Sequence, residues 1–310
     1  MERRTTCQPA DRTGLTIIEV LVAIGILGLL AAILMPAIQQ SRMTARQIAC
    51  ASHLRQIGLA AQQYHETFLH LPGKTLLYHL FPYLDLQAWF AAGFSQQDIG
   101  KRHEVLLCPL DALHDIAGSP SPYSYLVSGG GCWGCGEGME RFGPANQRGV
   151  SWRDVTDGLS ATAFLSERRA SLSHTPVLVD AAARRAACEA DPVRCVWKLG
   201  AVYGPGQDSS FAAACLDASR RSDPTFPEDV RAYWNPVGRP YLHVLPPNTP
   251  SCFRGYEFET SHPLGATSHH HGGVNLLLCD GSARFVSDSI SLPTWWAIGT
   301  RAGNDAVGEF

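Results

Sequence analysis

The stretch DRTGLTIIEVLVAIGILGLLAAILMPAIQQSR (residues 11–42) combines an apolar run of membrane length with one misplaced charge. From Leu15 to Met35 the only charged residue is Glu19, and the run is about as long as a helix needs to cross ~30 Å of hydrocarbon at ~1.5 Å per residue. A carboxylate inside a membrane span is costly, so the position of Glu19 predicts a partner for it. The orientation stays open because arginines flank the run on both sides: Arg3, Arg4, Arg12, Arg42, Arg46 and Arg55.

Gly14, which directly precedes the apolar run, supplies a candidate for that partner. Cutting the chain after Gly14 creates an α-amino group on Leu15, close to Glu19 in the sequence. Within one helix this ammonium and the carboxylate lie about a turn apart, whereas in two staggered helices they meet and set the packing register. An ordinary secretory signal is a weaker interpretation because its best cleavage motif, MPA at 35–37, is poor. A plain transmembrane anchor is the simpler alternative.

The residues GLTIIEVLVAIGILGLLAAILMPAI (14–38) resemble the class III signal of type IV pilins and type II secretion pseudopilins. The shared features are a leader ending in Gly14, a glutamate at the fifth mature position, Glu19, and a proline late in the span, Pro36. This resemblance implies that a membrane prepilin peptidase cleaves after Gly14 and methylates the amine of Leu15. It also implies that Glu19 pairs with the N-terminus of a neighbouring subunit during filament assembly. One departure is Leu15, where that family usually has Phe.

Residues 37–70 are predicted to continue the span as an amphipathic helix. Pro36 is predicted to kink the helix rather than end it. Beyond it, apolar residues recur at three- and four-residue steps, and their stripe is expected to pack on the following domain: Leu54, Ile57, Ala61, Tyr64 and Phe68. The helix is expected to stop near HLPGK (70–74). We therefore interpret residues 1–14 as a leader, 15–36 as a transmembrane helix and 37–70 as its amphipathic continuation.

Residues 71–310 are interpreted as one globular α+β domain in which an antiparallel sheet with long loops packs on the N-terminal helix, as in a pilin-like fold. The segment TLLYHLFPYLDLQAWFAAGF (75–94) predicts a strand and a short helix. EVLLCPLDA (104–112) predicts a buried strand entering a turn, and SYLVSGGGCWGCGEG (124–138) predicts a short strand running into a glycine-rich loop.

The segment SHHHGGVNLLLCDGSARFVSDSI (268–290) is the clearest hairpin in the chain. Gly272 and Gly273 open its first strand, and the Asp280-Gly281 pair predicts a type I′ turn. His270 precedes Asp280 with nine residues between them. This spacing is similar to the prepilin-processing-associated H-x9-DG domain of a large family of bacterial pilin-like proteins without an established biochemical activity. We assign that hairpin to residues 270–290.

Further segments resemble the same family in chain order. CASHLRQIGLAAQQYHE (50–66) resembles its Cys-x3-Leu-Lys-Gln-Ile-Gly-Leu-Ala segment, with Arg55 for Lys. LLCPLD (106–111) resembles Leu-Cys-Pro-Ser-Asp, with Leu110 for Ser, and VTDGLSATAFLSE (155–167) resembles Asp-Gly-Thr-Ser-Asn-Thr. The ending TWWAIGTRAGNDAVGEF (294–310) is also similar to the family's tail, whereas residues 171–250 match least.

Charge and cysteine content narrow the class of protein. A formal net charge of -3 without a dense Lys/Arg cluster argues against nucleic-acid binding. Ten cysteines favour an oxidising compartment. Cleavage before Leu15 removes Cys7 and leaves an odd number, so at least one cysteine is unpaired or bonded to another chain. The connectivity stays open, and CWGC (132–135) predicts a structural disulfide or two separate pairings.

Candidate metal and catalytic residues are present without a convincing arrangement. His262, His269, His270 and His271 near Cys279 suggest a metal site, but adjacent residues of an extended chain point to opposite faces. We therefore expect no metal or other cofactor, and we expect His270 to fix its loop by hydrogen bonding. Asp111, Asp157 and Glu167 have no spacing that pairs them, and Ser128 lacks the G-x-S-x-G frame. We expect no enzymatic activity.

The leading hypothesis is a pseudopilin-like structural subunit. Its expected partners are a prepilin peptidase, other pilin-like subunits and the lipid bilayer. Its expected location is the cytoplasmic membrane, crossed once, with the C-terminal domain in the periplasm or at the cell surface. The alternative is a monomeric membrane-anchored module that binds a ligand or a metal, and an anchored hydrolase is third. The sequence leaves open which secretion or pilus machine uses the subunit.

Overall fold

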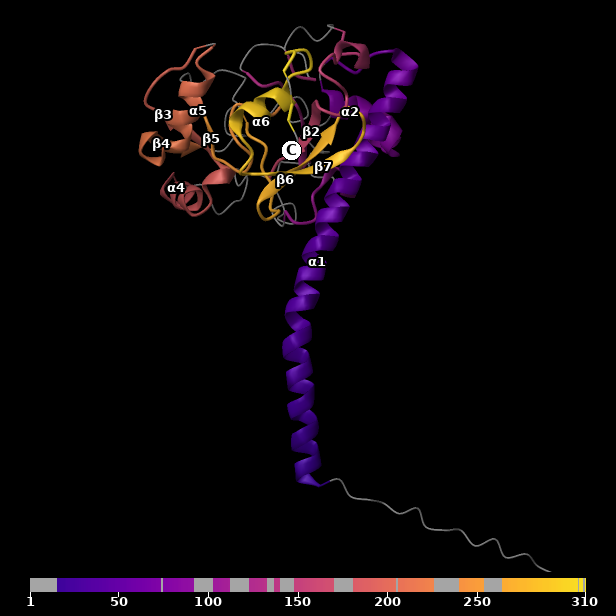
Figure 1. Cartoon of the computed structure of the whole chain (residues 1–310), viewed down its shortest axis with the longest axis vertical. Coiled ribbons are helices and arrows are strands. Elements are labelled where there is room, and N and C mark those ends of the chain that lie inside the picture. The colour runs from indigo at the N-terminus through magenta and orange to yellow at the C-terminus, as the bar shows by residue number, and fades with distance from the viewer. Residues whose placement is uncertain are drawn as a thin grey trace, which may run out of the picture. The chain divides into compact units, whose positions relative to one another are not determined.

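The computed structural model describes residues 16–73, 75–91, 103–111, 123–132, 137–139, 148–169, 181–204, 206–225, 240–253, 264–305, 307–308 and 310. The chain divides into two compact units, residues 1–45 and 46–310. Helix α1 (Ile17–Phe68), drawn in indigo and purple in Figure 1, contributes to both units. The second unit therefore begins before residue 71, where the globular domain was predicted to start.

The first part of α1 has the features of a capped apolar helix. The Glu19 carboxylate accepts hydrogen bonds from the Thr16 N–H and hydroxyl at 2.8 Å each, while the Glu19 N–H donates to the Thr16 hydroxyl at 3.4 Å. This reciprocal pair is a capping box, which satisfies backbone donors that a helix start leaves free. Pro36 lies inside α1 without ending it, as predicted. Every residue from 16 to 46 is exposed.

The second part of α1 packs into the core of the second unit. Cys50, Leu54, Ile57 and Ala61 are fully buried, which confirms most of the predicted apolar stripe. Phe68 differs, since it is 47% exposed. The helix ends there, and Leu69 follows in the left-handed conformation with φ 62°.

Among the described residues, 75–91 and 104–111 contain helices instead of the two predicted strands, whereas the short helix predicted within 75–94 is confirmed. Residues 75–94 contain α2 (Leu76–Leu80), the 3-10 helix η1 (Phe81–Leu84) and α3 (Gln87–Ala91). Leu76, Leu77, Leu80 and Phe81 are buried, and their spacing places them on one helical face. In the second segment, the described residues 104–111 contain the 3-10 helix η2 (Glu104–Leu106) instead of a strand.

A four-stranded antiparallel sheet confirms the α+β class. Its strands are β1 (Tyr125–Val127), β2 (Ala163–Glu167), β6 (Gly273–Leu278) and β7 (Ala283–Ser287), in the order β1-β2-β6-β7. Alternation along β6 separates two cores. Leu277 packs in the cluster that holds Leu54 and Ile57 of α1, whereas Val274 and Leu276 pack with Trp295 of α6 (Leu292–Gly299). The sheet therefore lies between the second part of α1 and α6 (Figure 1).

The predicted β6–β7 hairpin is confirmed, but its turn is not type I′. A type I′ turn needs a positive φ at both central residues, and Asp280 does not have one. Instead the Gly281 N–H donates to the Leu278 carbonyl at 3.0 Å, and the Leu278 N–H donates to the Ser282 carbonyl at 2.8 Å. Gly281 then takes φ 85°. This is the three-residue loop in which a glycine in the left-handed region follows the turn.

A second, smaller sheet was not predicted. It has the order β4-β3-β5, where β3 (Val196–Leu199) pairs antiparallel with β4 (Arg221–Thr225) and parallel with β5 (Ser251–Cys252). Around it lie α4 (Ala181–Ala190), α5 (Asp208–Leu216) and the 3-10 helices η6 (Pro192–Arg194) and η7 (Ala218–Arg220). A further 3-10 helix, η4 (Trp152–Asp154), precedes β2.

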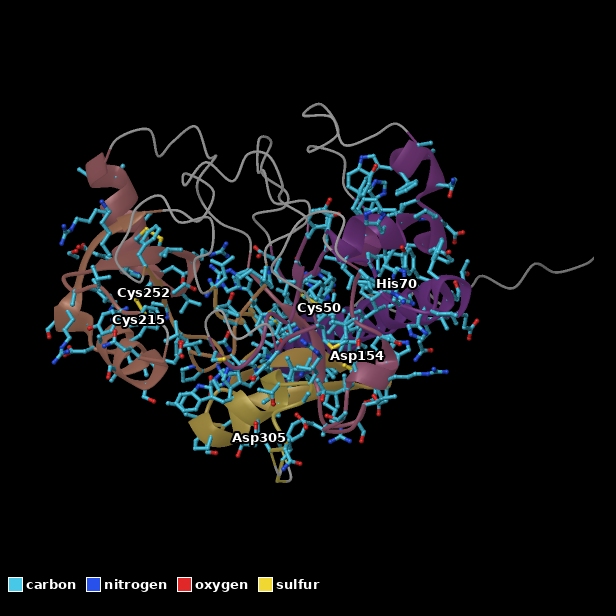
Figure 2. The ribbon with its side chains drawn as sticks, turned by 90° about the horizontal axis from the view of Figure 1, so that it is seen from above. Cys50, His70, Asp154, Cys215, Cys252 and Asp305 are labelled. Atoms are coloured by element: carbon cyan, nitrogen blue, oxygen red, sulfur yellow. A yellow bond between two sulfur atoms is a disulfide. The ribbon has the colours of Figure 1, made fainter. Side chains whose placement is uncertain are left out.

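Two disulfides lie beside the smaller sheet. Cys188 bonds to Cys195 and Cys215 to Cys252 beside the smaller sheet, and Figure 2 shows the latter pair well apart from Cys50. Cys132 is also disulfide-bonded, and Cys7 and Cys135 lie outside the described residues. Cys279 is free and buried. Burial raises the pKa of its thiol. The described residues thus include an unpaired cysteine, in agreement with the odd number of cysteines that cleavage before Leu15 leaves.

Candidate functional site

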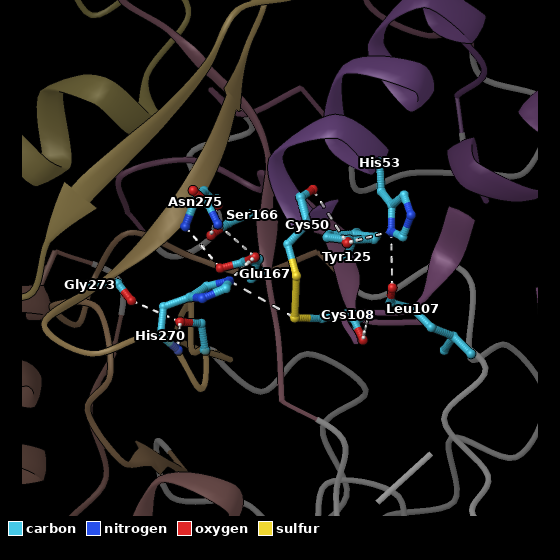
Figure 3. A network of polar contacts seen from close by, with 12 residues as sticks. Cys50, His53, Leu107, Cys108, Tyr125, Ser166, Glu167, His270, Gly273 and Asn275 are labelled. Carbon is cyan, nitrogen blue, oxygen red and sulfur yellow. Dashed lines mark hydrogen bonds and ion pairs between the residues drawn. A yellow bond between two sulfur atoms is a disulfide. The ribbon is translucent and has the colours of Figure 1, made fainter. Parts of the chain in front are cut away.

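A buried carboxylate, Glu167 at the end of β2, organises the candidate site (Figure 3). Its Oε2 accepts the Asn275 N–H, and its Oε1 accepts the Asn275 Nδ2–H, both at 2.9 Å. His270 Nε2 lies 3.0 Å from the same Oε1. Because Glu167 is 1% exposed, these donors take the place of the water that the carboxylate loses on folding.

The turn before β6 fixes the imidazole of His270. The His270 N–H donates to the Ser268 hydroxyl at 2.9 Å, and that hydroxyl donates to the Gly273 carbonyl at 2.8 Å. Asn248 joins from a neighbouring loop, accepting from the Ser268 N–H at 2.7 Å. Within this turn His270 bonds through its backbone N–H, so the expectation that it fixes its loop stays a prediction. Its ring is aimed at Glu167.

Two cysteines complete the site from segments far apart in the sequence. Cys50 of α1 is disulfide-bonded to Cys108, which follows η2, with a Cα–Cα distance of 5.3 Å. Cys108 Sγ lies 4.0 Å from His270 Nε2. The Cys108 N–H donates to the Ser124 hydroxyl at 2.8 Å, which ties this segment to the start of β1. Figure 3 shows the sulfur pair between α1 and the His270 ring.

His53 and Tyr125 border the sulfur pair on the α1 side. His53 Nδ1 lies 3.1 Å from the Leu107 carbonyl and 3.3 Å from the Tyr125 hydroxyl, which in turn donates to the Cys50 carbonyl at 3.5 Å. Burial lowers the pKa of His53 and raises the pKa of Tyr125. Both shifts favour the uncharged forms of these two side chains.

The arrangement brings four potential ligand atoms together. One atom each of Cys50, Cys108, Glu167 and His270 lies within 4.8 Å of all the others. The four residues are no more than 6% exposed. Two sulfurs, an imidazole and a carboxylate can form a crosslink or hold a metal ion.

The other residues singled out from the sequence lie elsewhere. Gly14 and Leu15 are outside the described residues. His270 and Asp280 lie before and after β6, so the strand separates them. The Asp280 N–H donates to the Leu159 carbonyl at 3.0 Å, and its carboxylate caps the Ser282 N–H at 2.8 Å. Gly273 allows a close backbone approach, since a Cβ there would lie 2.1 Å from the Val286 carbonyl oxygen.

The remaining predicted carboxylates and histidines have separate partners. Asp111 lies 3.5 Å from Arg194 and 3.4 Å from His269, and all three side chains are at least partly buried. Asp157 accepts from the N–H groups of Gly303 and Asn304 in the C-terminal tail. His271 is exposed, and His262 lies outside the described residues. Among the described residues, neither His269 nor His271 belongs to a group of ligand atoms that could hold a metal.

Sequence reasoning missed two features. The joining of Cys50 to Cys108 spans 58 residues, and no local pattern marks that pairing. A cavity of about 440 Å³ was also missed, and it is lined by His65, Leu69, Arg148, Gly149, Ser151, Arg153 and Asp154. Burial lowers the pKa of His65, and the nearby His70 and Arg153 charges lower it further. These residues have no spacing pattern along the chain from which the cavity could have been predicted.

Comparison with known proteins identifies a family. The sequence model of a family described as "Protein of unknown function (DUF1559)" matches residues 39–92 and 87–292. The matched residues include Cys50, Cys108, Glu167 and His270, whereas residues 1–38 lie outside the match. No curated protein and no solved structure matches the chain.

Proposed function

The chain belongs to the family described as "Protein of unknown function (DUF1559)", and from this premise we propose that it is a membrane-anchored, pseudopilin-like structural subunit. In this proposal a prepilin peptidase cuts after Gly14 and methylates Leu15. The first part of α1 crosses the cytoplasmic membrane, and residues 46–310 lie on its outer side. Subunits then associate through α1 in a filament of the type II secretion or type IV pilus kind.

The observation that carries the proposal is the uncovered apolar surface of α1. This helix is long and apolar enough to cross a membrane, and none of its apolar window is buried within the chain. Side chains such as Ile17, Leu27 and Ile33 are 82%, 64% and 64% exposed. An apolar surface of this extent requires lipid or other helices to cover it.

The carboxylate of Glu19 supports packing between copies. Both hydrogen bonds from Thr16 reach Oε2, and within the described part of the chain Oε1 takes none. In lipid an unsatisfied carboxylate oxygen is costly. The α-amino group of an adjacent subunit, created by cleavage before Leu15, fits that oxygen in charge and hydrogen bonding.

Glu19 has two candidate roles, which substitutions can separate. Glu19→Gln keeps the capping box, because glutamine also serves at that position, but it removes the charge. Thr16→Ala removes the capping hydroxyl and keeps the charge. We expect Glu19→Gln and Glu19→Ala to reduce crosslinked oligomers in membranes about tenfold, equivalent to ~1.4 kcal/mol, and we expect Thr16→Ala to retain them.

Processing is measured on the same samples by mass spectrometry of the N-terminus. All three variants should begin at Leu15, whereas replacing Gly14 should leave the leader attached. Crosslinking that survives Glu19→Ala would contradict a role of Glu19 in assembly, whereas a wild type without crosslinked oligomers would favour the monomeric anchored module. Loss in Thr16→Ala but not in Glu19→Gln would assign Glu19 to helix capping alone. A native chain beginning at Met1 would contradict the processing scheme.

A further inference from the structure

The disulfide between Cys50 and Cys108 occupies a place where a metal ion also fits. We propose that the reduced protein binds one zinc ion through Cys50 Sγ, Cys108 Sγ, His270 Nε2 and a carboxylate oxygen of Glu167. The disulfide and the zinc ion are then alternative links between α1 and the segment after η2. The site lies outside α1's apolar surface and is independent of filament assembly.

The distances are close to those of a tetrahedral site. Zinc binds sulfur at ~2.3 Å and nitrogen or oxygen at ~2.0 Å, which spaces neighbouring ligand atoms by roughly 3–4 Å. His270 Nε2 is 3.0 Å from Glu167 Oε1 and 4.0 Å from Cys108 Sγ. The Cα–Cα distance of 5.3 Å between the cysteines lets the two sulfurs separate by side-chain rotation after reduction.

The surrounding hydrogen bonds already orient the ligands. Asn275 holds both oxygens of Glu167, and Ser268 holds the backbone of His270. Partners of this kind fix the ligand geometry of metal sites. Burial of all four ligand residues to 6% exposure or less keeps competing water away. Ordered ligands in a dry site lower the cost of assembling the metal complex.

The ligand chemistry selects zinc. Thiolate and imidazole together suit zinc, whereas magnesium and calcium prefer oxygen ligands. Copper(I) prefers soft sulfur ligands and gains little from a carboxylate. A mixed set of two sulfurs, one nitrogen and one oxygen therefore fits a closed, four-coordinate zinc site.

The exchange between the two links needs a dithiol reductant. The reductant's two thiols become a disulfide, and their hydrogens and electrons convert the Cys50–Cys108 bond into two thiols. Zinc then displaces the two thiol protons and binds the thiolates. The neutral imidazole keeps its proton, which moves from Nε2 to Nδ1 as Nε2 binds the metal. Two protons are released for each zinc ion bound.

The test titrates cobalt(II), as a spectroscopic substitute for zinc, into the full chain in detergent after reduction and anaerobic desalting. We expect one cobalt per chain, with sulfur-to-cobalt charge-transfer absorption and the visible bands of a tetrahedral site. Zinc should abolish these bands. The oxidised chain should bind at least tenfold less. A folded, reduced chain without these bands would overturn the proposal.

Matched variants separate this site from the other thiols that reduction releases. His270→Gln and Glu167→Gln should weaken cobalt binding at least tenfold. Cys188→Ser/Cys195→Ser and Cys215→Ser/Cys252→Ser, which remove disulfides outside this ligand group, should leave it unchanged. An equal loss in both sets, or full binding by Cys50→Ser/Cys108→Ser, would contradict the assignment.

A variant that binds cobalt without a reductant tests the site even when reduction unfolds the wild type. Cys50→Ser frees Cys108 while the other disulfides stay intact, leaving a sulfur, an imidazole and a carboxylate as ligands. We expect this variant to bind cobalt through one sulfur, and we expect the added substitution His270→Gln to abolish binding. A folded Cys50→Ser chain that takes up no cobalt, or that binds equally well without His270, would refute the site.

Discussion

His243 is a buried histidine in which both ring nitrogens have partners. Its Nδ1 lies 2.9 Å from the Trp295 carbonyl, and its Nε2 lies 2.9 Å from the Tyr241 hydroxyl. These contacts suit a neutral ring that donates from Nδ1 and accepts at Nε2. Burial lowers the pKa of His243 to about 3, and the Trp295 carbonyl opposes that shift only in part. In its uncharged form the side chain thus joins α6 to Tyr241 in the segment before β5.

The position of His243 predicts a loss of stability in mild acid. Between its ordinary pKa of 6.5 and the folded value of about 3, the unfolded chain takes up a proton that the folded chain refuses. Stability contributed by this group is complete above pH ~6.5 and is lost as the pH falls. From pH 7 to pH 5 the loss is on the order of 2 kcal/mol.

Denaturant unfolding of the full chain in detergent at both pH values measures that loss. His243→Gln lowers stability at pH 7 but should shrink the difference between pH 7 and pH 5 by most of this amount. Exposed His271 is the matched control, and His271→Gln should keep the wild-type difference. An unchanged difference in His243→Gln would show that other groups set the acid sensitivity.

Local sequence patterns predicted the long helix and the long hairpin, but they did not predict most of the short helices and strands. Helix α1 and the β6–β7 hairpin carry sustained periodic signals, and both are present, although the hairpin turn is not the predicted type. Residues 75–94 contain adjacent apolar pairs, which fit a strand or a helix. In the structure the buried pairs Leu76–Leu77 and Leu80–Phe81 lie on one face of a helical segment. Strand β5 has two residues and is defined by its parallel pairing with β3, which no local pattern encodes.

The candidate site was predictable in its parts but not in its assembly. His270 was singled out by a motif resemblance, and Glu167 was considered only as one of three unpaired carboxylates. Their contact joins residues 103 positions apart. The Cys50–Cys108 link likewise depends on how α1 packs against the sheet. Spacing along the chain does not contain that information, because tertiary packing sets it.

The end of α1 has a left-handed leucine that a substitution should improve. Leu69 has φ 62° and is 65% exposed, and its N–H donates to the His65 carbonyl at 2.7 Å. A left-handed residue with a side chain costs roughly 1–2 kcal/mol, and glycine avoids much of this cost. After allowing for the entropy of glycine in the unfolded chain, Leu69→Gly should stabilise the protein by about 0.5–1 kcal/mol.

The same substitution inside the helix is the control. Leu59 is 56% exposed within α1, and Leu59→Gly should destabilise the protein by about 1 kcal/mol. Urea unfolding of the full chain in detergent compares the two. If Leu69→Gly and Leu59→Gly change the free energy of unfolding in the same direction, the left-handed conformation of Leu69 does not determine the effect of its substitution.

In the molecule as a whole, the two parts of α1 differ in how far their side chains are buried. Its first part exposes apolar side chains throughout, whereas its second part supplies core residues to the unit of residues 46–310. Gly58 lies against the β6–β7 turn, where an added Cβ would lie 3.1 Å from Leu277. The helix is therefore part of the domain core, and the domain is incomplete without it.

This division predicts where the chain can be cut to give a soluble domain. A fragment of residues 46–310 keeps Leu54 and Ile57 in the core and Cys50 bonded to Cys108. A fragment of residues 71–310 loses two fully buried large side chains, whose truncation costs about 2–5 kcal/mol each, together with the disulfide. Together these losses approach or exceed the free energy of unfolding of a typical domain, about 5–15 kcal/mol.

We expect the longer fragment to be monomeric with a cooperative thermal transition, and the shorter fragment to aggregate or to bind a hydrophobic dye. The fragment of residues 46–310 carrying Leu54→Ala and Ile57→Ala is the intermediate control, because it keeps the helix backbone and the disulfide but lacks the two core side chains. A shorter fragment with a cooperative transition as high as that of the longer one would show that the sheet and α6 make a sufficient core alone.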